Sequence, residues 1–147
     1  MAALKRNYSI RDLIEHSVEN APSLDIPGLV VEKYYTPRNG GKYMLFLANV
    51  QKNNDPKYCP ICRRMTKMNY SGVLDPQVIH DVVRNNCRVD IGIQPRRAVC
   101  TVCNNRITLP KPGVNENHSM TDRLVEFLEI ESFLQPHTVL ADRSGVI

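Results

Sequence analysis

The sequence predicts an α+β protein: an N-terminal helix and a β-hairpin, then a four-cysteine zinc ribbon, then C-terminal helices that form a partial helix-turn-helix. Three observations carry this prediction: two CxxC pairs, two strand-like runs joined by a turn, and two stretches of helical periodicity. The 147 residues are 42% hydrophobic and 23% charged, which excludes a fibre or a wholly disordered chain. We expect three segments, at residues 1–56, 57–110 and 111–147.

The first element is expected to be a short amphipathic helix over residues 9–20. Ser9 is a suitable N-cap and Pro22 would end the helix. Four apolar residues fall on one helical face at this spacing: Ile10, Leu13, Ile14 and Val18.

A β-hairpin is expected next, formed by the runs LVVEKYYT from Leu29 and KYMLFLANV from Lys42. The connection PRNGG contains Asn39 and Gly40, a pair that suits a hairpin turn. The polar stretch QKNNDPK then predicts a connector to the first cysteine pair.

The stretch between the cysteine pairs predicts a short helix followed by two strands. Asp75 and Pro76 can cap a helix that carries Val78, Ile79, Val82 and Val83, although an irregular loop fits the same residues. Val89, Ile91 and Ile93 then alternate with more polar residues, and RRAVC continues as extended chain.

The C-terminal segment predicts a helix that begins near Ser119, with Asp122 in its first turn, and ends before Pro136. A second, shorter helix is expected from about Thr138. Ala141 and Gly145 then have the spacing of the small residue and the turn glycine in a helix-turn-helix.

The strongest functional signal is the pair of motifs Cys59-Pro-Ile-Cys62 and Cys100-Thr-Val-Cys103, which are separated by 37 residues. Two residues between cysteines let both sulfurs reach one ion, and two such knuckles complete a tetrahedral shell. We therefore expect one structural Zn²⁺, bound by Cys59, Cys62, Cys100 and Cys103. Four thiolates leave no open position for water, so this site is not expected to be catalytic.

Two other cysteine chemistries fit less well. A thioredoxin-like dithiol would follow a strand and lie at the start of a helix, and a second CxxC motif would have no role in such a site. A zinc deaminase needs His-x-Glu before Pro-Cys-x-x-Cys, and no histidine of this chain has a glutamate two residues on. Cys87 is left over and is assigned no role.

Positive charge is concentrated around the cysteines. The formal net charge is +4, and residues 57–106 contain nine Lys/Arg against three Asp/Glu. Guanidinium groups on a zinc-held platform suit DNA phosphates, although solvated basic residues that offset the charge of the zinc cluster are the alternative. The residues expected to contact duplex DNA are Arg63, Arg64, Lys67, Arg88, Arg96, Arg97 and Arg106.

No membrane span or secretory signal is expected. The longest apolar run covers only residues 44–48, and the N-terminus carries charges where a signal peptide needs an apolar core. A cytoplasmic location is therefore predicted.

The order DIPGLVVEKYY, CPIC, RRAVCTVCNNRITLP, a long helix and LADRSGVI resembles the N-terminal region of bacterial insertion-sequence transposases of the ISL-three group, over roughly residues 24–147. In that family a hairpin leads into a four-cysteine zinc finger, a helix-turn-helix follows, and a DDE nuclease domain comes last. The resemblance implies zinc ligation by the four paired cysteines and DNA-backbone contact near Arg96 and Arg97. The nuclease domain has no counterpart here, so a non-catalytic module is expected.

The function predicted from sequence is thus that of a transposase-related, zinc-binding and DNA-binding module with no small-molecule substrate. The alternative is a zinc-stabilised protein-interaction or adaptor module that uses the helix at residues 119–135, which could also form a homodimer.

Overall fold

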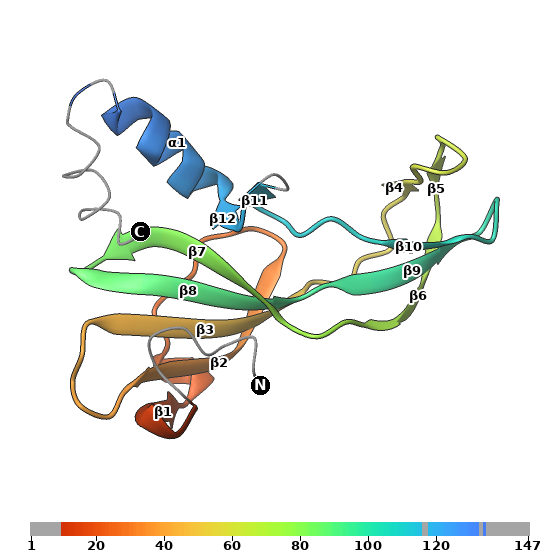
Figure 1. Ribbon diagram of the computed structural model, residues 1–147. Helices are drawn as coiled ribbons and strands as arrows, with labels where there is room; N and C mark the ends of the chain where they lie inside the picture. Colours follow the sequence, from red (N-terminus) through yellow and green to blue (C-terminus); the bar gives the residue numbers. More distant parts are fainter. Residues whose placement is uncertain (1–9, 116–117, 133, 135–147) are drawn as a thin grey trace.

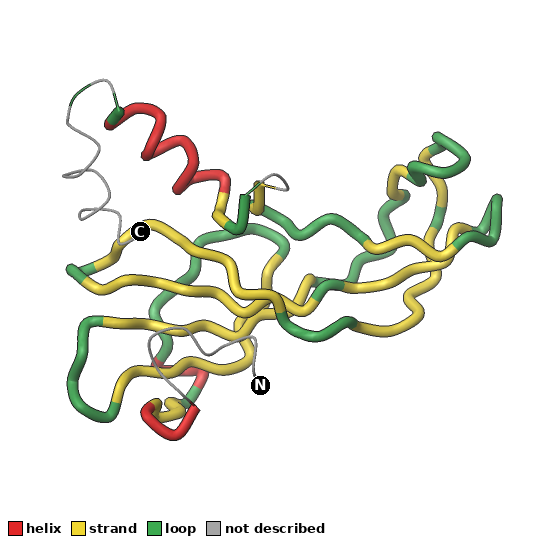
Figure 2. The backbone as a smooth tube through the Cα atoms, viewed as in Figure 1, coloured by secondary structure: helices red, strands yellow, loops and turns green. Residues whose placement is uncertain are grey.

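The computed structural model describes residues 10–115, 118–132 and 134 and consists mainly of β-strands. Figure 1 shows a large sheet with a narrower β-structure extending from one of its ends, and Figure 2 shows how little of the chain is helical. The elements are η2 (Ile10–Asp12), β1 (Leu13–His16), η3 (Val18–Asn20), β2 (Leu29–Pro37), β3 (Tyr43–Val50), β4 (Lys57–Tyr58), β5 (Met65–Thr66), β6 (Met68–Val73), β7 (Gln77–Arg84), β8 (Cys87–Gln94), β9 (Arg96–Cys100), β10 (Arg106–Thr108), β11 (Val114–Asn115), β12 (Met120–Thr121) and α1 (Asp122–Glu131).

The large sheet has seven strands in the order β1-β2-β3-β8-β7-β12-β11. The hairpin β2–β3 confirms the strands expected on either side of Asn39 and Gly40. Strand β3 then pairs in parallel with β8, and β7 pairs in parallel with β12, so the sheet is mixed. Phe46, Ile91 and Ile93 are fully buried in its core. We refer to this unit as the main sheet.

The prediction of an α+β fold that starts with a helix is wrong. Residues 10–20 form two short 3-10 turns around strand β1, which pairs antiparallel with β2. Leu13 is buried in a cluster with Tyr35, Tyr43 and Leu45, whereas Ile14 and Val18 are exposed. Pairing with β2 satisfies the backbone of this segment, which overrides its helical periodicity.

The expected helix after Pro76 is also wrong, because residues 77–84 form β7. The β-branched residues there favour an extended chain, and β7 pairs antiparallel with β8 across a two-residue turn. The strands expected at residues 89–93 and 96–100 are confirmed as parts of β8 and β9.

Together β6, β7, β8 and β9 form one long two-stranded arm. Its inner half, β7–β8, belongs to the main sheet, and its outer half, β6–β9, pairs with β10 in a three-stranded sheet. We call the outer part, residues 57–73 and 95–110, the zinc ribbon, after the metal that its two CxxC motifs predict. The long segment between the two CxxC motifs therefore forms most of this arm, and the inner half of the arm belongs to the main sheet.

The turn of this arm consists of Asn85 and Asn86, which both have positive φ, at 51° and 61°. Such a turn matches the twist of the flanking strands, and asparagine tolerates it better than most residues. We expect Asn86→Ala to lower the free energy of unfolding by about 1 kcal/mol, whereas Asn86→Gly should be neutral or stabilising. Urea unfolding of both variants measures this, and equal stability of the two would contradict it.

Helix α1 confirms a helix in the predicted C-terminal region, but it begins later than expected. Its N-cap is Thr121, whose hydroxyl accepts a hydrogen bond from Leu124 N, while Ser119 precedes the short strand β12. The expected helix from Thr138 and the helix-turn-helix residues Ala141 and Gly145 lie outside the described residues. No helix in the described part of the chain has the length and apolar character needed to cross a membrane.

Candidate metal centre and nucleic-acid interface

The two CxxC knuckles of the zinc ribbon have the same backbone geometry. In the first, Cys59 N donates to Arg64 O and Arg63 N donates to Cys59 O, at 2.9 and 2.7 Å. The second knuckle repeats both bonds from Cys100 onward, and the residues that reverse the chain, Arg63 and Asn104, both have φ of +58°. Each knuckle thus points its two sulfurs inward.

The four sulfur atoms converge on one point. The Sγ atoms of Cys59, Cys62, Cys100 and Cys103 all lie within 4.8 Å of one another. The separations are 3.7 Å for Cys59–Cys103 and 3.8 Å for Cys62–Cys100. Four sulfurs placed tetrahedrally about 2.3 Å from an ion are about 3.8 Å apart, whereas a disulfide needs about 2.05 Å. The predicted ligands therefore form a site of the right size for one four-coordinate metal ion.

Hydrogen bonds and burial shift the pKa values of the ligand thiols in opposite directions. Thr66 Oγ1 lies 3.1 Å from Cys100 Sγ, and this contact is the main reason why the pKa of Cys100 falls to about 6. In the opposite direction, burial raises the pKa of the Cys62 thiol to about 12. A metal needs all four as thiolates, so metal uptake is coupled to proton release.

The hydrophobic core of the zinc ribbon is small and is built around these ligands. It is separate from the core of the main sheet. Its buried members are Cys59, Ala98, Cys100, Ile107 and Leu109, with Cys62, Met68, Tyr70 and Cys103 packed against them. Four of these nine residues are the metal ligands, so little apolar surface is left to hold the ribbon together without an ion.

The three-stranded sheet of the ribbon has two different faces. Residues that are paired across an antiparallel sheet share a face, so Ala98 and Ile107 lie on the side of the buried core. Arg97 pairs with Thr108 on the opposite side of the sheet, and Arg106 lies on that side too. All three of these side chains are exposed. We call this side, with Asn69 of β6, the open face.

Apart from its cysteines, the zinc ribbon has charged side chains of one sign only. Its two stretches, residues 57–73 and 95–110, contain seven Lys/Arg and no Asp/Glu. The three acidic residues between the cysteine pairs lie outside it: Asp75 is in the connection from β6 to β7, and Asp81 and Asp90 are buried in the main sheet. The ribbon therefore holds seven of the nine basic residues of segment 57–106, with no acidic side chain to offset them, whereas Arg84 and Arg88 lie in the main sheet.

The structure separates the predicted DNA-contacting residues into two groups. Five of them are exposed on the ribbon: Arg63, Arg64, Lys67, Arg97 and Arg106. Arg96 turns inward, and its Nε donates to Val50 O at 2.8 Å, which ties the ribbon to the end of β3. Arg88 lies at the far end of β8, over the ring of Tyr43, and is about 25 Å from Arg96 along the strand.

Sequence reasoning missed two cations, Lys52 and Lys57, which lie with Arg96 around Tyr70. Lys52 Nζ, Lys57 Nζ and the guanidinium of Arg96 lie 5.7, 5.6 and 5.9 Å from the centre of the Tyr70 ring. The Tyr70 hydroxyl also donates to Asn53 O and accepts from Asn53 N. Both lysines lie within the polar connector QKNNDPK before Cys59, and their place there is the sequence signal that could have indicated them.

Cys87 lies apart from the metal centre. It begins β8 at the turn of the arm and packs, partly buried, against the core of the main sheet. Its position gives it no access to the four-cysteine cluster.

Comparison of the chain with models of protein families, with curated proteins and with solved structures gives no match.

Proposed function

We propose that this chain is a non-catalytic module in which a structural Zn²⁺ stabilises the ribbon and the open face of the ribbon binds the backbone of duplex DNA. The observation that carries the proposal is the charge of the ribbon, which has seven basic and no acidic residues around the four-cysteine site. An all-sulfur tetrahedral site suits zinc, and four protein ligands leave no position for a reacting water.

Duplex DNA fits the open face better than a single strand does. Arg97 and Arg106 are diagonal neighbours on adjacent strands, about 7–8 Å apart. Both side chains are exposed, so their guanidinium groups can contact phosphates. Binding of a single strand relies on aromatic stacking, and the described open face carries no aromatic residue. Tyr70 lies on the opposite, buried side.

The proposal predicts a salt-dependent affinity that is set by the open face. We expect zinc-loaded protein to bind an arbitrary duplex, with a slope of log affinity against log salt equivalent to several phosphates. The double variant Arg97→Ala/Arg106→Ala should reduce this slope by about two. Fluorescence anisotropy across a salt series measures both.

A matched control removes the same charge from the other end of the molecule. Arg11 and Lys42 are exposed near the turn of the β2–β3 hairpin, away from the ribbon, and Arg11→Ala/Lys42→Ala should leave the slope nearly unchanged. Equal losses in both double variants would mean that only net charge matters. No binding at low salt would reject the DNA proposal.

The second candidate function is protein interaction through α1. Ile130, near the end of α1, and Leu134, just after it, are 54% and 71% exposed, so apolar surface is exposed at the C-terminal end of this helix. A complex that is indifferent to salt and lost in Ile130→Glu would favour this function over DNA binding.

A further inference from the structure

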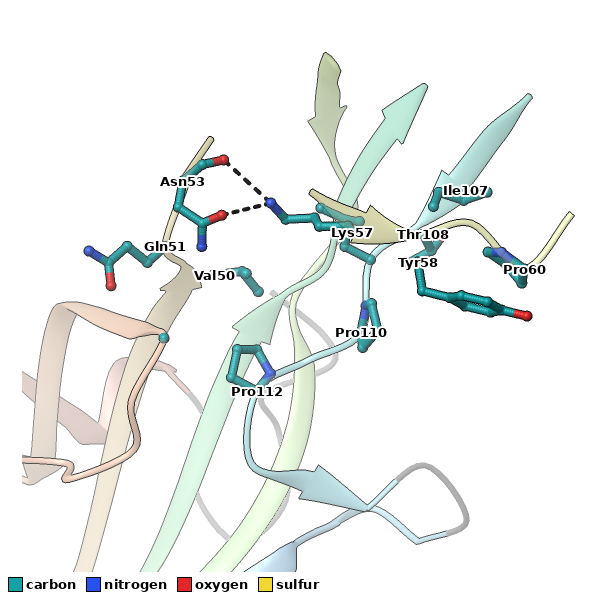
Figure 3. A pocket seen from close by; sticks show the side chains of 12 residues that line it. Val50, Gln51, Asn53, Lys57, Tyr58, Pro60, Ile107, Thr108, Pro110 and Pro112 are labelled. Atoms are coloured by element: carbon teal, nitrogen blue, oxygen red, sulfur yellow. Dashed lines mark hydrogen bonds between the residues drawn. The ribbon is translucent and has the colours of Figure 1, made fainter. Parts of the chain in front are cut away.

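A pocket of about 680 Å³ lies where the zinc ribbon joins the main sheet. Figure 3 shows its side chains, which come from the end of β3 and the connector, from the first knuckle, and from β10 and the chain that follows it. Its apolar walls are formed by Val50, Tyr58, Pro60, Ile107, Leu109, Pro110 and Pro112. Its volume lies within the range of about 300–1,000 Å³ that is usual for small-molecule and cofactor sites.

Close backbone packing builds one wall of this pocket. Gly28 has φ of +91°, and a Cβ there would lie 2.9 Å from Pro112 Cγ. Gly113 has φ of +68°, and a Cβ there would lie 2.7 Å from Ile26 Cγ2. Only glycine permits both contacts, which hold Pro112 against the start of β2. The wall is therefore part of the fold itself.

The rim of the pocket offers hydrogen-bonding groups. Asn53 Oδ1 accepts from Lys57 Nζ at 2.8 Å and from Asp55 N at 3.1 Å, which leaves the amide nitrogen of Asn53 as a donor. Thr108 of β10 also lines the pocket. A planar ligand with polar edges could pack its faces against the apolar walls and place its edge near Asn53 and Thr108.

Unpaired positive charge lies beside the rim. Asn53 and Lys57 both line the pocket and contact Tyr70, whose ring also has Lys52 and Arg96 near it. In the described part of the chain, no carboxylate forms an ion pair with any of these three cations. The Lys57 ammonium is occupied by oxygens of Asn53 and Asp55, whereas the Lys52 ammonium has no such contacts.

The pocket also adjoins β10, an edge strand of the three-stranded sheet whose opposite side belongs to the open face. Thr108 belongs to both, because it lines the pocket and pairs with Arg97 in the three-stranded sheet. A nucleic-acid strand that follows the open face would therefore reach the pocket by passing the edge of the sheet at β10.

We infer that this pocket binds an unpaired nucleotide at the end of a bound DNA duplex. The base would stack on Tyr58 and the prolines, its edge would meet Asn53 and Thr108, and the adjoining phosphate would lie near Lys52 and Arg96. The apolar walls fit a base, and the uncompensated cations fit a phosphate. This inference rests on the proposed function and specifies the end of the DNA that the module recognises.

The test compares a blunt duplex with the same duplex carrying a short single-stranded overhang. We expect the wild type to bind the overhang duplex about tenfold more tightly, and Tyr58→Ala to lose this preference while its affinity for the blunt duplex is unchanged. Lys52→Ala should weaken binding of the overhang duplex more than binding of the blunt duplex. A 2-aminopurine base in the overhang should be quenched on binding to the wild type and not to Tyr58→Ala.

The control variant is Met65→Ala. Met65 is the cross-strand partner of Tyr58 in the β4–β5 hairpin and does not line the pocket, and the two side chains are similarly exposed, at 65% and 55%. It should keep both the preference and the quenching, and the zinc content of each variant confirms that the ribbon is folded. Salt-sensitive binding with no preference for the overhang overturns the pocket inference alone, whereas no binding to either duplex overturns the proposed function with it.

Discussion

Replacing Cys100 by serine is expected to unfold the zinc ribbon and leave the main sheet folded. Cys100 is fully buried, and its sulfur is one of the four that meet at the metal site. A structural zinc site contributes on the order of 10 kcal/mol, and the apolar core of the ribbon is too small to replace it. The twelve buried residues of the main-sheet cluster include none of the metal ligands.

Hydrogen exchange read by mass spectrometry tests this expectation. Amides of β6 and β9 should lose protection in Cys100→Ser, or when a chelator removes the metal, while those of β3 and β8 keep it. Cys87→Ser is the matched control, because Cys87 is a cysteine outside the metal site, and it should change neither region. Full protection of the ribbon in Cys100→Ser, or freshly purified protein without zinc, would contradict the structural role of the ion.

Replacing Asp81 by alanine is expected to destabilise the main sheet by about 3–5 kcal/mol, because a buried, hydrogen-bonded ion pair would lose one partner. The Asp81 side chain is 1% exposed. Its carboxylate accepts from Thr121 Oγ1 and Arg123 Nε, both at 2.8 Å, and from Arg123 Nη2. Arg123 also donates to Leu24 O, and the hydrogen bond with Asp81 raises the pKa of the guanidinium. The network therefore joins the start of α1 to β7.

Urea denaturation of zinc-loaded protein measures this loss, and a double-mutant cycle with Arg123→Ala isolates the contribution of the pair. An exposed ion pair serves as the control. Lys33 Nζ and Glu15 Oε1 are 3.7 Å apart on side chains that are 52% and 57% exposed, so Lys33→Ala should cost less than about 1 kcal/mol. Similar losses in Asp81→Ala and Lys33→Ala would contradict the structural role given to the buried network.

Several features could be predicted from sequence because they depend on short-range chemistry. The CxxC spacing indicated all four metal ligands, since each knuckle is a local turn that directs its own two sulfurs. The Asn39-Gly40 pair indicated the β2–β3 hairpin for the same reason. The concentration of basic residues near the cysteines was also visible, since charge along the chain needs no fold to be counted.

The tertiary structure decided what depends on partners distant in the chain. Residues 13–16 became a strand because β2 offers them an unpaired edge, and residues 77–84 became a strand because β8 pairs with them. Successive side chains of β9 point to opposite faces, so Arg96 turns inward while Arg97 is exposed. Arg88 lies at the far end of the long arm, over Tyr43, and so is distant from the ribbon. The pocket and the cation group at Tyr70 join segments up to 84 residues apart, from Gly28 to Pro112, so no local pattern could indicate them. The sequence by itself determined the four metal ligands and the concentration of basic charge, because both depend only on residues close together in the chain. Only the tertiary structure decided which side chains share a face of a sheet, because strand pairing sets the register.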